Sequence, residues 1–405
     1  MAVFGEPAID LTDDRLAARN VVVLAVAQAL AGGNSTVIVA TGAISGSMLA
    51  PSPALATLPV SVMVVGMWIG TLPVGLLAKA YGRRTALQIG SAFGAASGLI
   101  SCAAVLHESF ALLLFGALCG GLYASAHQSY RFAAADNATP QFRPKAVAWV
   151  LAGGVFAAVL GPQLVILTKD MWPAYLFAAT YLAQSACAVL TAAVLMLLNI
   201  PRPHVSHSLR DGRPLATIIA QPKFIAAVVS GVAGYTMMNM VMTAAPLAMV
   251  MCSHSVGQAA LGIQWHVIGM YAPSFITGSL ILRFGVWRLM ALGLMLIVAA
   301  ATIGLLGIAL WNFWIALALL GIGWNFAFIS ATALVTECHD PHERNKVQAF
   351  NDFLVFGASA IGSFSSGALL SGYGWDAVNA MAYPVIFVAA LLLVWGSLQR
   401  RRELT

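Results

Sequence analysis

Charge is what this sequence has least of. Only 8% of its 405 residues are charged and 60% are apolar, whereas soluble domains are roughly a quarter charged and about half apolar. Long apolar runs recur along the whole chain, and a helix needs about 20 such residues to cross roughly 30 Å of hydrocarbon. The composition therefore excludes a water-soluble fold and predicts a multi-pass membrane protein.

The sequence also lacks a disulfide framework, a signal peptide and the motifs of an enzyme. Its five cysteines are scattered and have no CxxC spacing. The first twenty residues are too polar and acidic for a secretory leader. No apolar segment contains a nucleophile–base pair, a phosphate loop or a pair of carboxylates. We therefore expect neither enzymatic activity nor a cofactor, and an N-terminus that stays in the cytoplasm.

Apolar runs separated by turn signals predict an all-α membrane protein with twelve transmembrane helices. The predicted helices span residues 21–44, 54–78, 86–106, 109–132, 146–168, 173–198, 223–250, 258–284, 288–308, 311–336, 347–371 and 376–398. The polar, proline-rich stretch 199–222 separates a six-helix bundle at 21–198 from a second bundle at 223–398. Short cytoplasmic segments, 1–20 and 399–405, complete the predicted organisation.

Lysine and arginine positions test this topology. Of the 20 such residues, 19 fall on the side shared with the N-terminus, and only Lys169 falls on the other. Cytoplasmic loops collect these residues, and one helix more or fewer would invert every later loop. Both termini are therefore expected in the cytoplasm, with the chain in a bacterial inner membrane. The net charge of +6 follows from these loops and indicates a lipid bilayer, not nucleic acid, as the partner.

A glycine- and arginine-rich loop follows the second predicted helix and is echoed after the eighth. The first loop contains Gly75, Lys79, Gly82, Arg83 and Arg84, and the echo runs over residues 278–288. Glycines permit tight turns and close helix approach, and arginines bond helix-end carbonyls and anionic headgroups. Because the two loops occupy matching positions in the two halves of the chain, they indicate a duplicated unit. The loop resembles the loop 2–3 signature of the major facilitator superfamily, although Lys79 stands where that family usually has an acidic residue.

This resemblance implies a pseudo-symmetric bundle of six plus six helices. In that superfamily the substrate binds between the halves near the membrane midplane, and the halves rock around it.

Two helices each carry a pair of donor side chains one turn apart. Met238 and Met242 lie in the seventh helix, and His266 and Met270 lie in the eighth. Residues four apart share a helix face. Met238 and Met270 lie equally far along the chain from residue 254 in the polar turn, and so do Met242 and His266. The antiparallel helices therefore place the two pairs at the same depth in the membrane. Thioethers favour Cu(I), imidazole adds a nitrogen donor, and uncharged ligands leave the ion exchangeable. The pattern predicts a copper site inside the membrane.

Ordinary packing is the competing interpretation of such pairs. Methionine is a common packing residue, and Met63 and Met67 on the second helix have the same spacing with no histidine nearby. A histidine inside a membrane helix is costly unless it faces a cavity or a partner, which favours a binding site.

The paired motifs resemble those of the CcoA-like copper importers of the superfamily, and this resemblance covers the full chain. It implies copper import into the cytoplasm for assembly of cbb3-type cytochrome oxidase, with copper as the transported substrate. The implied ligands are Met238, Met242, His266 and Met270, and a cytoplasmic copper chaperone or thiol reductant is a candidate partner. The same family includes carriers of riboflavin, so membership alone does not choose copper.

Other candidate residues lie outside the paired motifs. Four crowd the turn between the seventh and eighth helices, where they would either capture an arriving ion or simply form a loop: Met249, Met251, Cys252 and His254. Two ionisable residues, His127 and Arg131, lie one turn apart near the cytoplasmic end of the fourth helix. Intramembrane ionisable groups are functional candidates, although Arg131 can instead reach the interface.

Two other functions remain open. A carrier of an organic solute, such as a flavin or a drug, would use aromatic surfaces for stacking, and the candidates are Trp68, Trp265, Tyr271 and Trp324. A membrane-bound copper sensor or assembly partner would bind the ion without moving it. Asp352, near the start of the eleventh helix, is not at a helix centre, so the sequence leaves the energy coupling open.

Overall fold

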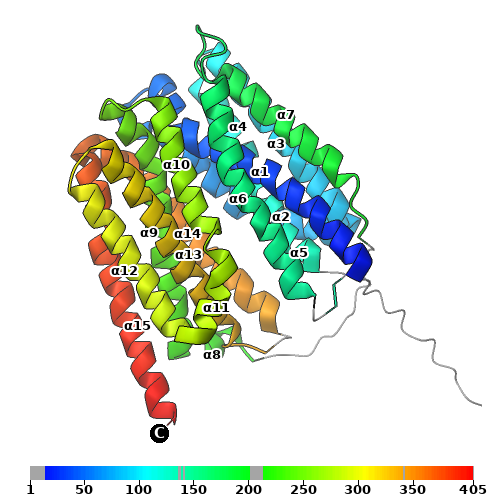
Figure 1. The fold of residues 1–405 in the computed structure, drawn as a ribbon, viewed down its shortest axis with the longest axis vertical. Helices are drawn as coiled ribbons and strands as arrows, with labels where there is room; N and C mark the ends of the chain where they lie inside the picture. The colour runs from blue at the N-terminus through cyan, green and yellow to red at the C-terminus, as the bar shows by residue number, and fades with distance from the viewer. Residues whose placement is uncertain (1–13, 136–137, 140–141, 201–212, 341–342, 405) are drawn as a thin grey trace, which may run out of the picture.

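A computed structural model describes the chain except residues 1–13, 136–137, 140–141, 201–212, 341–342 and 405. In the first half the helices are α1 (Asp14–Leu49), the 3₁₀ turn η1 (Pro53–Leu55), α2 (Leu58–Tyr81), α3 (Arg83–Leu106), α4 (Phe110–Gln128), α5 (Tyr130–Ala135), α6 (Arg143–Thr168) and α7 (Ala178–Leu195). In the second half they are α8 (Leu215–Ile219), α9 (Pro222–Met251), α10 (Val256–Tyr271), α11 (Ser274–Phe284), α12 (Val286–Leu305), α13 (Leu310–Thr336), α14 (Arg344–Ala380) and α15 (Ala382–Leu404). Figure 1 shows the two halves side by side.

The helices supply the twelve predicted spans. Ten described helical segments are long and apolar enough to cross a membrane, and the bent pair of α10 and α11 supplies an eleventh. One of the ten, 346–400, has 55 residues and would measure about 80 Å if straight, far more than one bilayer. It is broken at Gly374, whose φ is +79°, so it provides two spans. The predicted membrane fold is confirmed.

Several predicted boundaries differ from those of the structure, and one predicted helix is bent. The first helix begins at least seven residues earlier than predicted, at Asp14. The sixth begins five residues later, at Ala178, because Phe177 adopts a left-handed conformation with φ +70°. The eighth is bent by 43° between α10 and α11, where Pro273 lacks an N–H and crowds the preceding turn. Most of segment 1–20 and the middle of loop 199–222 lie outside the described residues.

The duplicated turn predicted from the glycine-rich loops is confirmed. Gly82 joins α2 to α3 with φ +90° and ψ 157°, and Gly285 joins α11 to α12 with φ +86° and ψ 148°. Only glycine adopts these angles readily. The close helix approach expected at Gly75 is absent in this structure, because a β-carbon there would meet nothing within 4 Å. The side chain of Lys79 lies outside the described part of the chain.

The two halves fit tightly together on the side of the membrane that bears η1, which the topology places in the periplasm. A β-carbon added to Gly367 of α14 would lie 2.3 Å from Oγ1 of Thr57 and 2.7 Å from the carbonyl oxygen of Ala54. Hydroxyl groups also meet across the halves, with 2.9 Å between the oxygens of Ser61 and Ser363. The periplasmic side is therefore closed.

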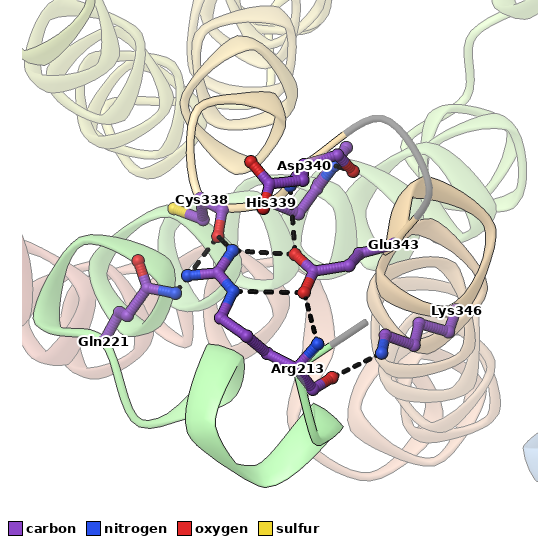
Figure 2. Close-up of polar contacts among 7 residues, drawn as sticks. All are labelled: Arg213, Gln221, Cys338, His339, Asp340, Glu343 and Lys346. Atoms are coloured by element: carbon purple, nitrogen blue, oxygen red, sulfur yellow. Dashed lines mark hydrogen bonds and ion pairs between the residues drawn. The ribbon is translucent and has the colours of Figure 1, made fainter. Parts of the chain in front are cut away.

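An ion pair between the exposed Arg213 and the buried Glu343 holds the end of the central loop against the second half (Figure 2). Arg213 donates from its guanidinium to both carboxylate oxygens of Glu343, at 3.0 and 2.7 Å, and its backbone N–H donates to the same carboxylate. Gln221 and Arg213 both donate to the carbonyl oxygen of Cys338, and Lys346 donates to the carbonyl of Arg213. The Glu343 side chain is 0% exposed, so water cannot replace these partners.

Glu343→Gln should lower the melting temperature of the purified protein at neutral pH. The bonds from Arg213 hold the pKa of Glu343 well below the ordinary carboxyl value of 4.5. A lowered folded-state pKa stabilises the fold above that ordinary value, and the contribution is lost as the pH falls below it. The difference in melting temperature between wild type and variant should therefore narrow as the pH is lowered from about 7 to about 3. A constant difference would contradict this account.

Glu337→Gln is the matched control for that measurement. Glu337 pairs with Lys223, and 53% of its side chain is exposed. Exposed ion pairs contribute little to stability, so this variant should melt close to wild type.

Candidate functional site

An uncharged cavity of about 110 Å³ lies between the two halves near the middle of the bundle. Helices α1, α2, α4 and α6 line it from the first half, and α9 and α10 line it from the second. None of its lining residues is Asp, Glu, Lys or Arg; its polar side chains are Gln28, Ser35, Thr36, His127, Gln128, Tyr235, Asn239 and Tyr271. A site contacted by both halves is positioned to be exposed alternately to the two sides.

Three side-chain amides in this cavity have no protein partner. Gln28 on α1, Gln128 on α4 and Asn239 on α9 line the cavity, and within the described part of the chain none of them forms a side-chain hydrogen bond. Gln28 and Asn239 are nearly completely buried. Their nitrogen and oxygen atoms are not among the described side-chain atoms that are fully buried without a partner, so these amides are accessible from the cavity and can bond to water or to the donors and acceptors of a ligand.

His127 adds a fourth polar group to the cavity. Its Nε2 lies 3.3 Å from Oγ of Ser35, and its Nδ1 is buried with no partner among the described atoms. Its ring packs edge-on against Tyr123 and Tyr130, each with a centroid distance of 6.3 Å. This predicted candidate therefore lies at the site, held in place by aromatic neighbours.

The predicted methionines form an apolar wall of the same cavity. Met63 and Met67 from α2 line it together with Met238, Met242 and Met270. The turn between α9 and α10 lies at residues 252–255, as the equal spacing of the two motifs predicts.

His266 does not join these methionines. It is not among the cavity-lining residues, it is 0% exposed, and its Nδ1 lies 2.9 Å from the carbonyl oxygen of Leu317 on α13. Val267, Met270 and Tyr271 are the α10 residues that face the cavity. Positions four apart differ by about 40° around a helix, and here that rotation separates His266 from Met270. Three of the four predicted copper ligands are brought together, and the nitrogen donor is not among them.

The predicted capture cluster is dispersed over the periplasmic turn. Met249 is buried, with its sulfur beside Gly262 of α10, whereas Met251 is 61% exposed. Cys252 is half-buried, and His254 pairs with the carbonyl oxygen of Ile308 at 2.9 Å. These residues share none of the described cavities. Among the described residues no group of three or more His, Cys, Asp or Glu is arranged to hold a metal ion.

A second cavity, of about 520 Å³, extends from the first toward the cytoplasmic ends of the helices. Both cavities are lined by Met67 and Gln128. The second cavity is also lined by Arg83 and Arg131 from the first half and by Asp352 from the second. Because the periplasmic side is closed and this cavity lies on the other side, the structure is an inward-facing state.

Aromatic side chains gather where the two cavities meet. Tyr235 contacts the rings of Trp324, Phe328 and Phe356 at centroid distances of 5.5, 5.1 and 5.4 Å. Tyr271 lines the central cavity, and Trp68 lines the second cavity against Phe353. Of the predicted stacking residues, Trp265 is exposed and Trp324 is buried, and neither lines the central or the second cavity. Sequence reasoning missed Gln28, Asn239 and Tyr235, although polar residues inside apolar runs were the available signal.

The comparisons with known proteins agree on the fold. Residues 24–263 and 227–404 match the family described as Major Facilitator Superfamily. The solved structure of a D-xylose–proton symporter has a TM-score of 0.72 at 16% identity and covers 92% of this chain and 96% of that one. A bacterial homologue of the human lysosomal transporter Spinster, in an inward-facing and occupied conformation, has a TM-score of 0.68 at 16% identity, covering 93% and 96%.

Sequence relatives bear on the substrate. The chain is 47% identical to the riboflavin transporter RfnT of Brucella anthropi over 388 residues, which are 95% of this chain and 96% of that protein. It is 28% identical to the uncharacterised transporter YdeG of Bacillus subtilis, over 93% and 92% of the two chains. These findings confirm a transporter and not an enzyme.

The prediction of copper import was wrong. The relative that matches nearly the whole chain at 47% identity is a riboflavin transporter. The error arose because three thioethers on one wall of a cavity suit an aromatic ring as well as they suit a soft metal ion, and the motif spacing could not distinguish the two.

Proposed function

The chain belongs to the major facilitator superfamily, and we propose that it carries riboflavin, or a flavin with the same ring system, into the cytoplasm. The observation that carries this proposal is the uncharged central cavity, where Gln28, Gln128 and Asn239 offer amides that no described protein group satisfies. The 47% identity to a riboflavin transporter supports the same substrate. A flavin is uncharged at its ring and carries donors and acceptors along one edge.

The cavity lining offers partners for both ends of a flavin ring. The amides and His127 suit the pyrimidine edge, which presents carbonyl oxygens and an N–H. The methionine wall suits the dimethylbenzene end, because thioethers make favourable contacts with aromatic rings. Tyr235 and Tyr271 offer aromatic surfaces nearby.

The cavity volumes suit a flavin only when they are combined. Sites for ligands of this size measure about 300–1,000 Å³, so the central volume of about 110 Å³ holds part of the molecule. The adjoining volume of about 520 Å³ has room for the ribityl chain. We therefore place one end of the ring in the central cavity, with the rest of the molecule extending into the adjoining cavity toward the cytoplasm.

Uptake of labelled riboflavin by cells that cannot synthesise it tests the proposed function directly. Cells producing the wild-type chain should accumulate the label above cells with an empty vector, and excess unlabelled riboflavin should abolish the difference. Excess ribitol should not compete, because it lacks the ring. Equal accumulation in both strains, with the protein verified in the membrane, would contradict the proposal.

Replacing the two α9 methionines with leucine should keep riboflavin uptake within roughly tenfold of wild type. Met238→Leu/Met242→Leu conserves volume, and such swaps usually cost below about 1.5 kcal/mol. This small cost is expected because the methionines only pack against the substrate, and the double variant therefore keeps uptake at this level. The measurement is the initial uptake rate at equal protein level. Complete loss of uptake would show that the sulfur atoms have a specific role.

A further inference from the structure

An apolar groove of about 930 Å³ runs along the first half between α1 and α6. The two helices pack along one another (Figure 1). Their backbones approach closely at the floor of the groove, where a β-carbon on Gly153 would lie 2.4 Å from the carbonyl oxygen of Ala25. The groove shares no lining residue with the central cavity, and Val22 and Phe156 on its rim are 65% and 70% exposed. It therefore opens toward the surrounding lipid.

The groove spans one leaflet of the bilayer. On α1 its lining runs from Ala18 to Leu30, a rise of about 18 Å, and half of a hydrocarbon core of roughly 30 Å is about 15 Å. Ala18 and Phe142 mark its cytoplasmic end, so it lies in the cytoplasmic leaflet. Of the described lining side chains, only that of Trp149 has a polar atom. The groove therefore has the length and the chemistry that suit an acyl chain.

Two basic residues stand at the cytoplasmic end of this groove. On α1, Arg19 precedes the lining residue Val22 by three positions. On α6, Lys145 precedes the lining residue Trp149 by four. Residues three or four apart share a helix face, so both basic residues lie on the faces that form the groove. Both are exposed, and neither forms an ion pair with another described residue.

The charges at the start of α1 cancel and leave this end of the groove positive. Asp14 and Arg15 are neighbours with opposite charges. The carboxylate of Asp14 accepts hydrogen bonds from the backbone N–H and the hydroxyl of Thr139, at 3.1 and 3.0 Å. Arg19 and Lys145 can lay their apolar stems along the groove while their charged ends stay at the headgroups. Their two positive charges therefore remain available to an anion at the membrane surface.

We propose that this groove binds an anionic phospholipid of the cytoplasmic leaflet, with one acyl chain between α1 and α6 and the phosphate held by Arg19 and Lys145. The proposal does not depend on which substrate the protein carries. A zwitterionic headgroup contains an ammonium that the two cations repel, whereas an anionic headgroup has a net charge that they attract. Both helices line the central cavity with other faces, so the bound lipid supports the wall of that cavity from outside.

A second copy of this chain is a poorer occupant of the groove. All copies in one membrane share one orientation, so a symmetric pair joined along the groove has both copies of Arg19 and Lys145 at the same depth. Four positive charges then face one another at the edge of the interface, and like charges repel more strongly beside an apolar medium than in water. An anionic lipid neutralises the same residues.

Native mass spectrometry of the purified full-length chain in detergent tests this site. The chain is titrated with phosphatidylglycerol or with phosphatidylethanolamine of the same acyl chains, and the dissociation constant of the first bound lipid is measured for each. The wild-type chain should bind phosphatidylglycerol more tightly. Each basic residue near an anionic membrane surface contributes about fivefold. Arg19→Gln/Lys145→Gln should therefore weaken phosphatidylglycerol binding by roughly 30-fold and remove the preference.

Ala152→Phe tests the acyl-chain part of the site. Ala152 lines the groove, and a phenyl ring there occupies the space of the chain, so this variant should bind both lipids more weakly. Ala193→Phe is its matched control, because Ala193 is exposed near the cytoplasmic end of α7 and lines none of the described cavities. It should bind both lipids as the wild-type chain does.

Arg283→Gln/Arg288→Gln is the matched control for charge. These two arginines are exposed beside the turn between α11 and α12 and line none of the described cavities, so phosphatidylglycerol binding should be unchanged. Equal binding of the two lipids by the wild-type chain, or an equal loss in this control, would overturn the site. Unchanged binding by Ala152→Phe would place the lipid elsewhere, and a dimer without bound lipid would assign the groove to a second copy. If Ala152→Phe does not fold, the result for Arg19→Gln/Lys145→Gln decides.

Discussion

Gly367→Leu should lower riboflavin uptake by roughly 5- to 150-fold while the protein remains folded in the membrane. Even a β-carbon at this position would lie 2.3 Å from Oγ1 of Thr57 and 2.7 Å from the backbone oxygen of Ala54 in the opposite half. Overpacking of this kind costs about 1–3 kcal/mol, which disfavours the state closed to the periplasm by roughly 5- to 150-fold. Since a carrier must visit that state to release its substrate inside, uptake falls by a similar factor.

The measurement is initial uptake of labelled riboflavin together with a reporter of periplasmic access. Ser61→Cys places a thiol at a position that is completely buried in the closed interface. Its labelling by a membrane-impermeant maleimide should increase when Gly367→Leu is added. Gly372→Leu is the matched control, because a β-carbon at Gly372 of the same helix meets nothing within 4 Å. Normal uptake by Gly367→Leu, or an equal loss of uptake in the Gly372→Leu control, would contradict a role for this contact in closing the periplasmic side.

The double variant Gln28→Leu/Asn239→Leu should lose most of its affinity for riboflavin. These amides come from opposite halves and line the central cavity without described protein partners. Leaving a polar edge of the bound molecule unpaired costs about 1–3 kcal/mol per contact. Each substitution is therefore expected to weaken binding by roughly 5- to 150-fold, and the double variant by more than either alone.

Quenching of riboflavin fluorescence on the purified protein measures this affinity without requiring transport. Asn312→Leu is the control, because Asn312 donates to the carbonyl oxygen of Ile303 at 3.2 Å and lines neither inter-half cavity. The affinity of the Asn312→Leu variant for riboflavin should match that of the wild-type protein. An unchanged affinity in the double variant would place the flavin elsewhere in the protein.

The membrane topology could be predicted from the sequence because its causes are local. Whether a segment crosses the bilayer depends on its own apolar length, and the orientation depends on the charges in the short loops beside it. The same holds for the paired turns, since Gly82 and Gly285 adopt positive φ angles that glycine alone tolerates well. The break at Gly374 likewise falls between the predicted eleventh and twelfth helices.

The site could be predicted only in part, because helix faces are set by packing between segments far apart in the chain. The spacing predicted that Met238, Met242 and Met270 would converge inside the membrane, and all three line one cavity. It could not reveal that His266 faces Leu317 of α13. Nor could it show that Asn239, in the same methionine run, has an unsatisfied amide that faces the cavity.

The sequence by itself therefore determined that this chain spans the membrane with two related six-helix halves and both ends in the cytoplasm. Those features follow from the cost of placing each segment's side chains in hydrocarbon or water. Only the tertiary structure decided that the central cavity is uncharged and lined by amides, that the protein is inward-facing, and that Asp352 and Arg131 line one cavity. These features depend on how the two halves contact each other across the interface, and no single segment encodes that arrangement.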